Sequence, residues 1–124
     1  MGKVVFDISM SLDGFMTAAN RRPEEPMGDG GQRLHEWAFG DDQRDREVLT
    51  SGVGTLGAVM GGAETGQQYL RAGLVDELSI HLVPVLFGSG TRMFENLGDQ
   101  HIQLEPAHVI QTAAATHLRF RIAK

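Results

Sequence analysis

One stretch, residues 59–94, constrains the fold of this chain more than any other part of it. It contains a short apolar run, two adjacent glycines, a segment of helical character that ends near Gly73, and a second apolar run. A strand, a tight glycine turn and a helix in this order bring the first turn of the helix to the end of the strand. Unpaired backbone N–H groups and the helix dipole meet there, and both favour an anion. The segment therefore predicts a phosphate-binding corner.

The corner itself is expected directly after the apolar run 58–60. Gly61 and Gly62 permit backbone angles and a close approach that a side chain would forbid, and residues 65–72 are expected to form the helix. The Thr65 hydroxyl would add a donor, whereas the Glu64 carboxylate would compete with a phosphate. We predict a nucleotide site made by Val59, Met60, Gly61, Gly62, Ala63, Glu64 and Thr65. The alternative is that the two glycines only make a tight turn.

The remaining chain mixes strand and helix patterns. We expect a strand over 3–11, a short helix over 34–39, and a polar helix over 41–50 that is mostly solvated or laid along a partner. A long apolar strand over 75–87 with a bend near Pro84 should follow, and then a closing hairpin with strands over 102–110 and 116–122. In the last strand His117, Arg119 and Arg121 alternate with apolar residues, which predicts one solvated face. The five histidines are scattered without metal-ligand spacing, so no metal site is predicted.

Both ends of the chain resemble a known family. The run GGAETGQQYLRAGLVDELSIHLVPVLFGSGTRMFE, with KVVFDISMSLDGF and GDGGQRLHEWAFG before it, is similar to the reductase domain of riboflavin biosynthesis and its dihydrofolate-reductase-like relatives, especially the small stand-alone bacterial members. The resemblance implies an α/β fold, a reduced dihydrofolate-reductase-like three-layer sandwich. Its mixed sheet would have about five strands, with two or three helices and an antiparallel C-terminal hairpin. The resemblance also implies NADPH as the cofactor and a homodimer, in which the glycine-rich segment 52–62 could let the two chains exchange elements.

The resemblance breaks in the middle of the chain. Family members carry additional strands and helices between a first VMG segment, followed by basic residues, and the later Gly-Gly turn. This sequence instead runs from REVLTSGVGTLGAV directly into MGGAETGQQ. We interpret the chain as one dihydrofolate-reductase-like domain, residues 1–124, internally shortened near 52–62. One function that follows is NADPH-dependent hydride transfer to a small pterin- or pyrimidine-like heterocycle. The alternative is a non-catalytic dimeric remnant with a ligand-binding or structural role.

Asp13 is the candidate catalytic residue. It follows a predicted strand in the sequence SLDG, and in the family that the chain resembles this loop faces the substrate ring, where a carboxylate could hydrogen-bond ring nitrogens. Alternatively, Asp13 only turns the chain ahead of Gly14. Substrate contacts are expected from Ser11, Asp13, Gly14, Trp37 and Arg92. The alternatives are core packing for Trp37 and an ordinary surface charge for Arg92.

Composition narrows the class of partner. A chain of 124 residues that is 41% hydrophobic can bury one core, and a net charge of -5 argues against nucleic acid and anionic membrane surfaces. No run reaches the roughly 18 apolar residues of a membrane span, and the absence of cysteine excludes disulfides and thiolate sites. We therefore expect a small-molecule site, a cytoplasmic location, and an oligomer that covers the open edge of a shortened sheet.

Overall fold

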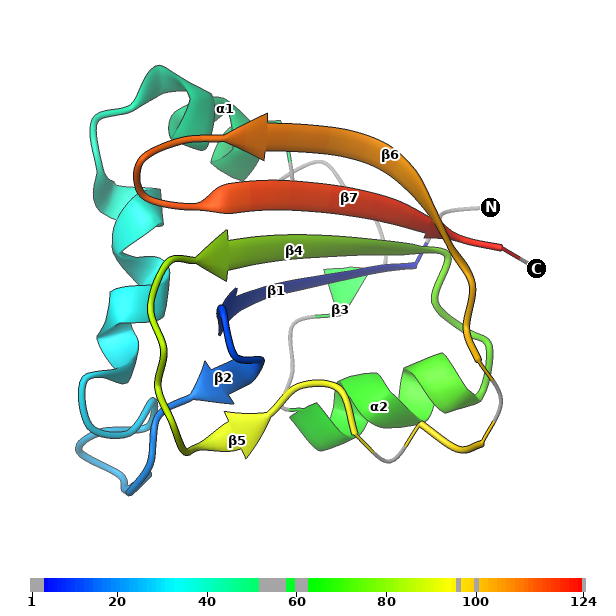
Figure 1. Ribbon diagram of the computed structural model, residues 1–124, viewed down its shortest axis with the longest axis horizontal. Helices are drawn as coiled ribbons and strands as arrows, with labels where there is room; N and C mark the ends of the chain where they lie inside the picture. The colour runs from blue at the N-terminus through cyan, green and yellow to red at the C-terminus, as the bar shows by residue number, and fades with distance from the viewer. Residues whose placement is uncertain (1–3, 52–57, 60–62, 96, 100, 124) are drawn as a thin grey trace.

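The computed structural model describes residues 4–51, 58–59, 63–95, 97–99 and 101–123, with the backbone alone described at 50–51, 58–59 and 63–65. Over these ranges the chain forms a five-stranded mixed sheet with a two-stranded sheet beside it (Figure 1). The strands are β1 (Val5–Ser11), β2 (Phe15–Thr17), β3 (Ala58–Val59), β4 (Glu77–Val83), β5 (Thr91–Arg92), β6 (Leu104–Gln111) and β7 (Thr116–Ile122). The helices are the 3-10 helix η1 (Gly31–Phe39), α1 (Gln43–Ser51) and α2 (Ala63–Arg71).

The larger sheet combines a parallel half with an antiparallel half. Its strand order is β3-β1-β4-β7-β6. Strand β1 is parallel to both of its neighbours, with Val5 opposite Ala58 on one side and Glu77 on the other. Strand β7 is antiparallel to β4 and to β6. The carboxyl ends of β3, β1 and β4 therefore point the same way, and open α/β sheets bind ligands outside such ends.

Alternation along β1 divides its side chains between two layers. Phe6 and Ile8 belong to the apolar cluster that includes Leu70 of α2. On the other face, Ser9 accepts a hydrogen bond from the indole of Trp37 in η1. Because successive strand residues point to opposite faces, α2 covers one face of the sheet, and η1 lies on the other. The sheet is thus the middle layer of a three-layer α/β sandwich.

Helix α2 lies unusually close to β1. A Cβ atom added at Gly66 would fall 2.0 Å from the Phe6 ring, so the helix backbone rests directly on that ring. The helix ends at Gly73, which has a left-handed backbone (φ 71°), and the Leu74 amide donates to the Tyr69 carbonyl at 3.1 Å. These features are typical of a glycine C-cap and confirm the predicted helix end.

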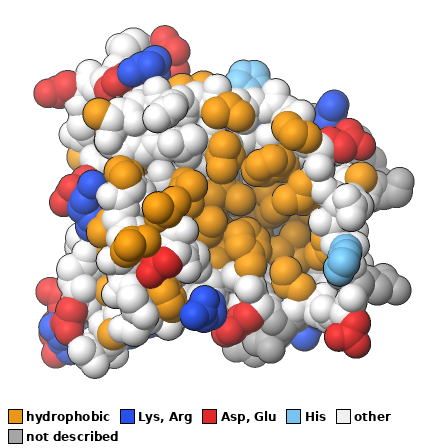
Figure 2. Space-filling model, viewed as in Figure 1, with side chains coloured by type: hydrophobic (Ala, Val, Ile, Leu, Met, Phe, Trp, Pro, Cys, Tyr) orange, Lys and Arg blue, Asp and Glu red, His pale blue; other side chains and the backbone are white. Residues whose placement is uncertain are grey.

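The face that α2 covers also carries an apolar hollow. Figure 2 shows hydrophobic side chains gathered near the centre of this face. A cavity of about 450 Å³ lies there, and residues from α2, β4, β6 and the segment before β6 line it, among them Leu70, Leu78, Ile80, Leu97, Ile102 and Leu104. Helix α2 therefore covers only part of the apolar surface of the sheet.

The predicted fold class is confirmed, and two local predictions were wrong. The apolar strand expected over 75–87 ends at Val83, because the chain turns at Pro84 and the Val85 amide donates to the Val83 carbonyl. His117 was expected on a solvated face, but its exposed fraction is 4%, because Asp45 of α1 packs against it. The polar helix α1 is mostly exposed, as expected, and Asp45 is the one buried side chain among those that the structure describes in it.

Candidate functional site

The predicted nucleotide corner falls between β3 and α2. Strand β3 ends at Val59, opposite Phe6 of β1, and α2 begins at Ala63. Of the residues predicted to bind the nucleotide, Met60, Gly61 and Gly62 lie outside the described residues. The structure describes the backbone of Val59, Ala63, Glu64 and Thr65, which has the predicted strand-then-helix order. The start of α2 thus follows the carboxyl end of a parallel strand, as a phosphate corner requires.

Asp13 holds two loops together at the carboxyl end of β1. Its carboxylate accepts hydrogen bonds from the Ser11 hydroxyl at 2.5 Å and from the backbone amides of Phe87 and Gly88 at 3.1 and 2.8 Å. The bond from Ser11 is the largest cause, with the two amides adding to it, and the pKa of Asp13 falls from 3.8 to about 2. Near neutral pH the Asp13 side chain is therefore a carboxylate anion. It accepts hydrogen bonds and has no proton to donate.

Hydrogen bonds connect the Asp13 loop to α2. The Gln67 side chain of α2 donates to the Met93 carbonyl at 3.0 Å. The Met93 amide in turn donates to the Gly14 carbonyl at 3.0 Å. The helix that follows the glycine corner and the turn that carries Asp13 are therefore fixed to each other through the segment at β5.

Ser11, Gly14 and Arg92 lie around this turn, whereas Trp37 contacts the sheet from η1. Ser11 and Trp37 are buried. Ser11 has no exposed surface and accepts a bond from the Phe15 amide at 3.0 Å. Gly14 has a left-handed backbone (φ 93°) with open space where a side chain would be. The exposed Arg92 places its guanidinium 4.9 Å from the centre of the Phe15 ring. Trp37 is 5% exposed and belongs to a buried cluster, which favours the core alternative.

A pair of buried histidines lies on the η1 side of the sheet. The Nδ1 atoms of His81 and His117 are 2.8 Å apart. The remaining ring nitrogens meet carboxylates: His81 Nε2 lies 2.7 Å from Asp7 Oδ1, and His117 Nε2 lies 2.6 Å from Asp45 Oδ1. The Thr112 hydroxyl also donates to Asp45 at 2.8 Å. Four side chains from β1, β4, β7 and α1 thus form one continuous hydrogen-bonded chain.

The Trp37 ring packs against both imidazoles of this hydrogen-bonded chain. The Trp37 ring centre lies 4.4 Å from that of His81 and 4.7 Å from that of His117. Nearby, burial lowers the pKa of His35 in η1, and its electrostatic interaction with His81 lowers it further. The indole therefore shields the imidazole pair from solvent and holds η1 against the sheet.

Sequence reasoning missed the histidine pair. Reading the histidines separately gave no ligand spacing, although His81 and His117 occupy paired positions in the antiparallel strands β4 and β7. Aligning the two strands in register would have placed the rings together. Asp45 gave no signal, because a carboxylate among other polar residues is ordinary on a helix.

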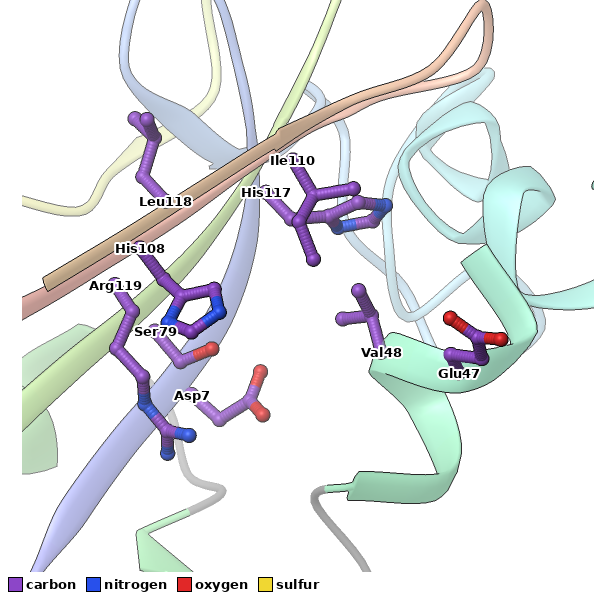
Figure 3. A pocket seen from close by; sticks show the side chains of 9 residues that line it. All are labelled: Asp7, Glu47, Val48, Ser79, His108, Ile110, His117, Leu118 and Arg119. Atoms are coloured by element: carbon purple, nitrogen blue, oxygen red, sulfur yellow. The ribbon is translucent and has the colours of Figure 1, made fainter. Parts of the chain in front are cut away.

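A pocket opens beside the histidine pair, between the sheet and α1 (Figure 3). Its volume is about 300 Å³, at the lower end of the range for small-molecule sites. Asp7, Ser79 and Arg119 extend from the sheet into it, and Val48 faces them from α1. His117 and His108 also line the pocket. The Nε of Arg119 is buried without a hydrogen-bond partner and lies 3.4 Å from Glu77, an ion-pair distance.

The sequence matches one protein family over most of its length. The model of the RibD C-terminal domain matches residues 46–118, which is more than half of the chain. The chain belongs to this family. No curated protein sequence matches it.

Solved structures with the same fold include proteins that are named for riboflavin biosynthesis. A putative riboflavin biosynthesis protein from Shewanella sp. PV-4 matches with a TM-score of 0.60 and 16% identity over 100% of both chains. RibD from Acinetobacter baumannii matches with a TM-score of 0.64 and 15% identity, over 100% of this chain and 59% of that one. A pyrimidine reductase-like protein from Corynebacterium diphtheriae matches with a TM-score of 0.63 and 11% identity, over 99% of this chain and 92% of that one. Identities this low show a shared fold alone.

The range that matches the RibD C-terminal domain includes the strand before the glycine corner and the helix after it. Residues 46–118 include β3, α2 and β4, whereas β1 and the Asp13 turn precede the matched range.

Over the residues that the structure describes, no group of His, Cys, Asp and Glu is placed to hold a metal ion. No helix in the same part of the chain is long and apolar enough to cross a membrane.

Proposed function

We propose that this chain is a reductase-like protein of the riboflavin-pathway type, which transfers a hydride from NADPH to a small pterin- or pyrimidine-like heterocycle. One observation carries the proposal: the start of α2 and the Asp13 turn lie at the same end of the parallel strands and are joined through Gln67 and Met93. Family membership and the pyrimidine reductase-like protein among the structural neighbours support it.

The cofactor would occupy the corner after β3. When bound, NADPH supplies the hydride. The backbone amides at Gly61 and Gly62 would bind its phosphates, with the Thr65 hydroxyl as a further donor. The described geometry fits this role, because α2 begins four residues after the end of a parallel strand, at Ala63.

The substrate ring would lie beside Asp13. An ionised carboxylate with a pKa of about 2 accepts hydrogen bonds from ring N–H groups and orients the ring for hydride transfer. Gly14 leaves room for the ring, and Arg92 would bind an anionic group of the substrate. Ser11 and Trp37 are buried and would support the site indirectly. Ser11 donates a hydrogen bond to Asp13, and Trp37 holds η1 against the sheet.

The experiment that tests the corner is a fluorescence titration with NADPH. We expect Gly62→Asp to abolish binding, because the new side chain adds both bulk and negative charge where phosphate would lie. The matched control is Gly40→Asp at the end of η1, where an added Cβ has only ordinary contacts. If Gly62→Asp binds NADPH as tightly as the control, the nucleotide site is elsewhere.

The second candidate is a non-catalytic dimeric remnant of the fold. It is favoured by the single VMG segment and by the direct junction of REVLTSGVGTLGAV with MGGAETGQQ. A ligand at ten times its dissociation constant stabilises a protein by about 1.4 kcal/mol. An unchanged melting temperature at millimolar NADPH would therefore favour the remnant over the reductase.

We also propose that the chain is a homodimer. The apolar hollow over β4 and β6 is the observation that supports this, because a second copy of the same chain would cover hydrophobic surface that α2 leaves open. Sedimentation velocity should give a dimer for the wild type and a shift toward monomer for Leu104→Glu, whose side chain is 39% exposed at the hollow. A monodisperse wild-type monomer would contradict the proposal.

A cytoplasmic location is proposed as the default, since a chain without cysteine carries no redox signal for another compartment. Fractionation of cells that express the chain tests it, and recovery in the membrane or secreted fraction would overturn it.

A further inference from the structure

Helix α1 is attached to the sheet chiefly through one buried side chain. Among the α1 side chains that the structure describes, Asp45 alone is buried, and Val48 is partly buried against an apolar cluster. The Asp45 carboxylate accepts a hydrogen bond from the Thr112 hydroxyl and lies 2.6 Å from Nε2 of His117. The attachment of α1 therefore depends on the protonation of His117 and of the imidazole that contacts it.

The contact distances require three protons on the hydrogen-bonded chain of Asp7, His81, His117 and Asp45. Its links measure 2.7, 2.8 and 2.6 Å in that order, and each needs one hydrogen between its two atoms. Two neutral imidazoles carry one N–H each, and ionised carboxylates carry none. The third proton belongs to an imidazole, because imidazole is a stronger base than a carboxylate. The pair then carries one positive charge, which compensates the buried carboxylate of Asp45.

The same distances exclude a fourth proton. The Nδ1 atoms of His81 and His117 are 2.8 Å apart, so only one of them carries a hydrogen. If both imidazoles were charged, two N–H groups would point at each other across this gap, and the rings would have to separate. Each ring is enclosed, with an exposed fraction of 4%, so separation also moves the elements packed on it. The packed arrangement therefore permits one charge on the pair, neither none nor two.

Other ionisable groups face the pair from the elements around it. They are His35 of η1, Glu47 of α1, Glu77 of β4, His108 of β6 and Arg119 of β7. Glu77 and Arg119 form an ion pair with each other at 3.4 Å. Burial, and then the interaction with His81, lower the pKa of His35, so His35 destabilises the fold as the pH falls and not as it rises. A loss of packing above neutral pH would therefore identify the pair and not His35.

We propose that the His81–His117 pair is a pH-dependent switch for α1, which holds the helix on the sheet while the pair carries one charge and releases it when the pair carries none or two. Through Glu47 and Val48, α1 also forms one wall of the pocket beside the sheet (Figure 3). Release of α1 removes this wall, so the pH controls access to the polar face of the sheet. The proposal does not depend on NADPH binding.

Proton counting gives the expected pH dependence. Solvated histidines gain charge near pH 6.5. When α1 is released, the two rings together hold one extra proton on average at this pH, which is the number that the packed pair holds. At higher pH they hold fewer, and at lower pH more. The equilibrium constant for release should therefore be smallest near pH 6.5 and rise about threefold at pH 5.5 and at pH 7.5, for as long as the packed pair keeps its single charge.

The proton count is tested first, on the wild type. Nitrogen-15 NMR of the histidine side chains distinguishes protonated from unprotonated ring nitrogens. We expect three protons over the four ring nitrogens of His81 and His117 near pH 6.5. Two or four protons, in a protein with a folded amide spectrum, would overturn the proposal. This measurement needs no variant.

Amide hydrogen exchange of α1 tests the release, with α2 as the internal reference. Protection factors, which are corrected for the intrinsic pH dependence of exchange, should be highest in α1 near pH 6.5. They should fall about threefold at pH 5.5 and at pH 7.5 without a matching fall in α2. Protection of α1 that is absent, that stays constant over this range, or that falls only in step with α2 would overturn the proposal.

Variants assign the fall in protection above pH 6.5 to the pair. Asp45→Asn removes the buried charge that retains the third proton, so this fall should shrink. Asp41→Asn, at a fully exposed side chain just before α1, is the matched control and should keep the wild-type profile. His35→Gln should also keep the fall above pH 6.5. An unchanged fall in folded Asp45→Asn, or its loss in His35→Gln, would overturn the assignment to the pair.

Discussion

The Nδ1 atoms of His81 and His117 lie 2.8 Å apart across β4 and β7, in which the two residues are direct partners. Trp37 covers both rings, and Asp45 ties one of them to α1. The contact therefore joins the sheet to both helices on that face. The histidine contact occupies a buried position where apolar side chains are usual. Substitutions at the two histidines therefore measure its contribution to stability.

Removing one histidine should destabilise the fold more than the loss of one contact suggests. His81→Leu leaves a buried nitrogen of His117 without a partner, which costs about 1–3 kcal/mol. The double variant with His117→Leu should cost less than the sum of the single variants, with a coupling of about 0.5–3 kcal/mol. Urea unfolding measures all three. His108→Leu, at an exposed position of β6, is the control, and additive single effects would contradict the coupling.

The lowered pKa of Asp13 predicts that the protein loses stability in acid. Because its pKa in the folded protein is lowered from 3.8 to about 2, its contribution is present above pH 3.8 and is lost as the pH falls toward about 2. Asp13→Asn should flatten this part of the stability profile and loosen the segment around Gly88. Urea unfolding from pH 5 to pH 2 measures the change, with Asp99→Asn as a control on an exposed side chain. Parallel profiles for wild type and Asp13→Asn would refute the role of the carboxylate.

Gly66 should tolerate no side chain. Gly66→Ala places a Cβ 2.0 Å from the Phe6 ring, so either α2 or the ring must move. Overpacking of this kind costs about 1–3 kcal/mol. The smaller side chain in Phe6→Leu should recover part of that loss when the two changes are combined. Thermal unfolding measures the effect, and Gln68→Ala on the exposed face of the same helix is the control. Equal stability of Gly66→Ala and the control would mean that the close approach is absent.

Local patterns in the sequence predicted the elements but not the contacts between distant residues. The hairpin of β6 and β7, the Gly73 helix end and the bend at Pro84 each follow from turn chemistry within a few residues. By contrast, His117 was predicted to face solvent, because alternation gives the two faces of a strand without saying what covers each. Asp45 lies among other polar residues, so the sequence does not distinguish it from a solvated side chain. Both residues are buried because α1 packs on β7.

The family resemblance predicted the fold and the position of Asp13 at the end of β1, but not the form of its environment. Three donors fix Asp13, two of them from a segment more than seventy residues away in the chain. Such a contact depends on the register of β1 with β4, which no local pattern encodes. The nucleotide residues remain a prediction from the Gly-Gly turn.

The most direct test of the reductase account is a crystal structure of the protein soaked with NADPH. The account predicts density for the pyrophosphate at the start of α2, next to Ala63, with the amides that follow Val59 directed at it. An empty corner, or one filled by the Glu64 carboxylate, would contradict it.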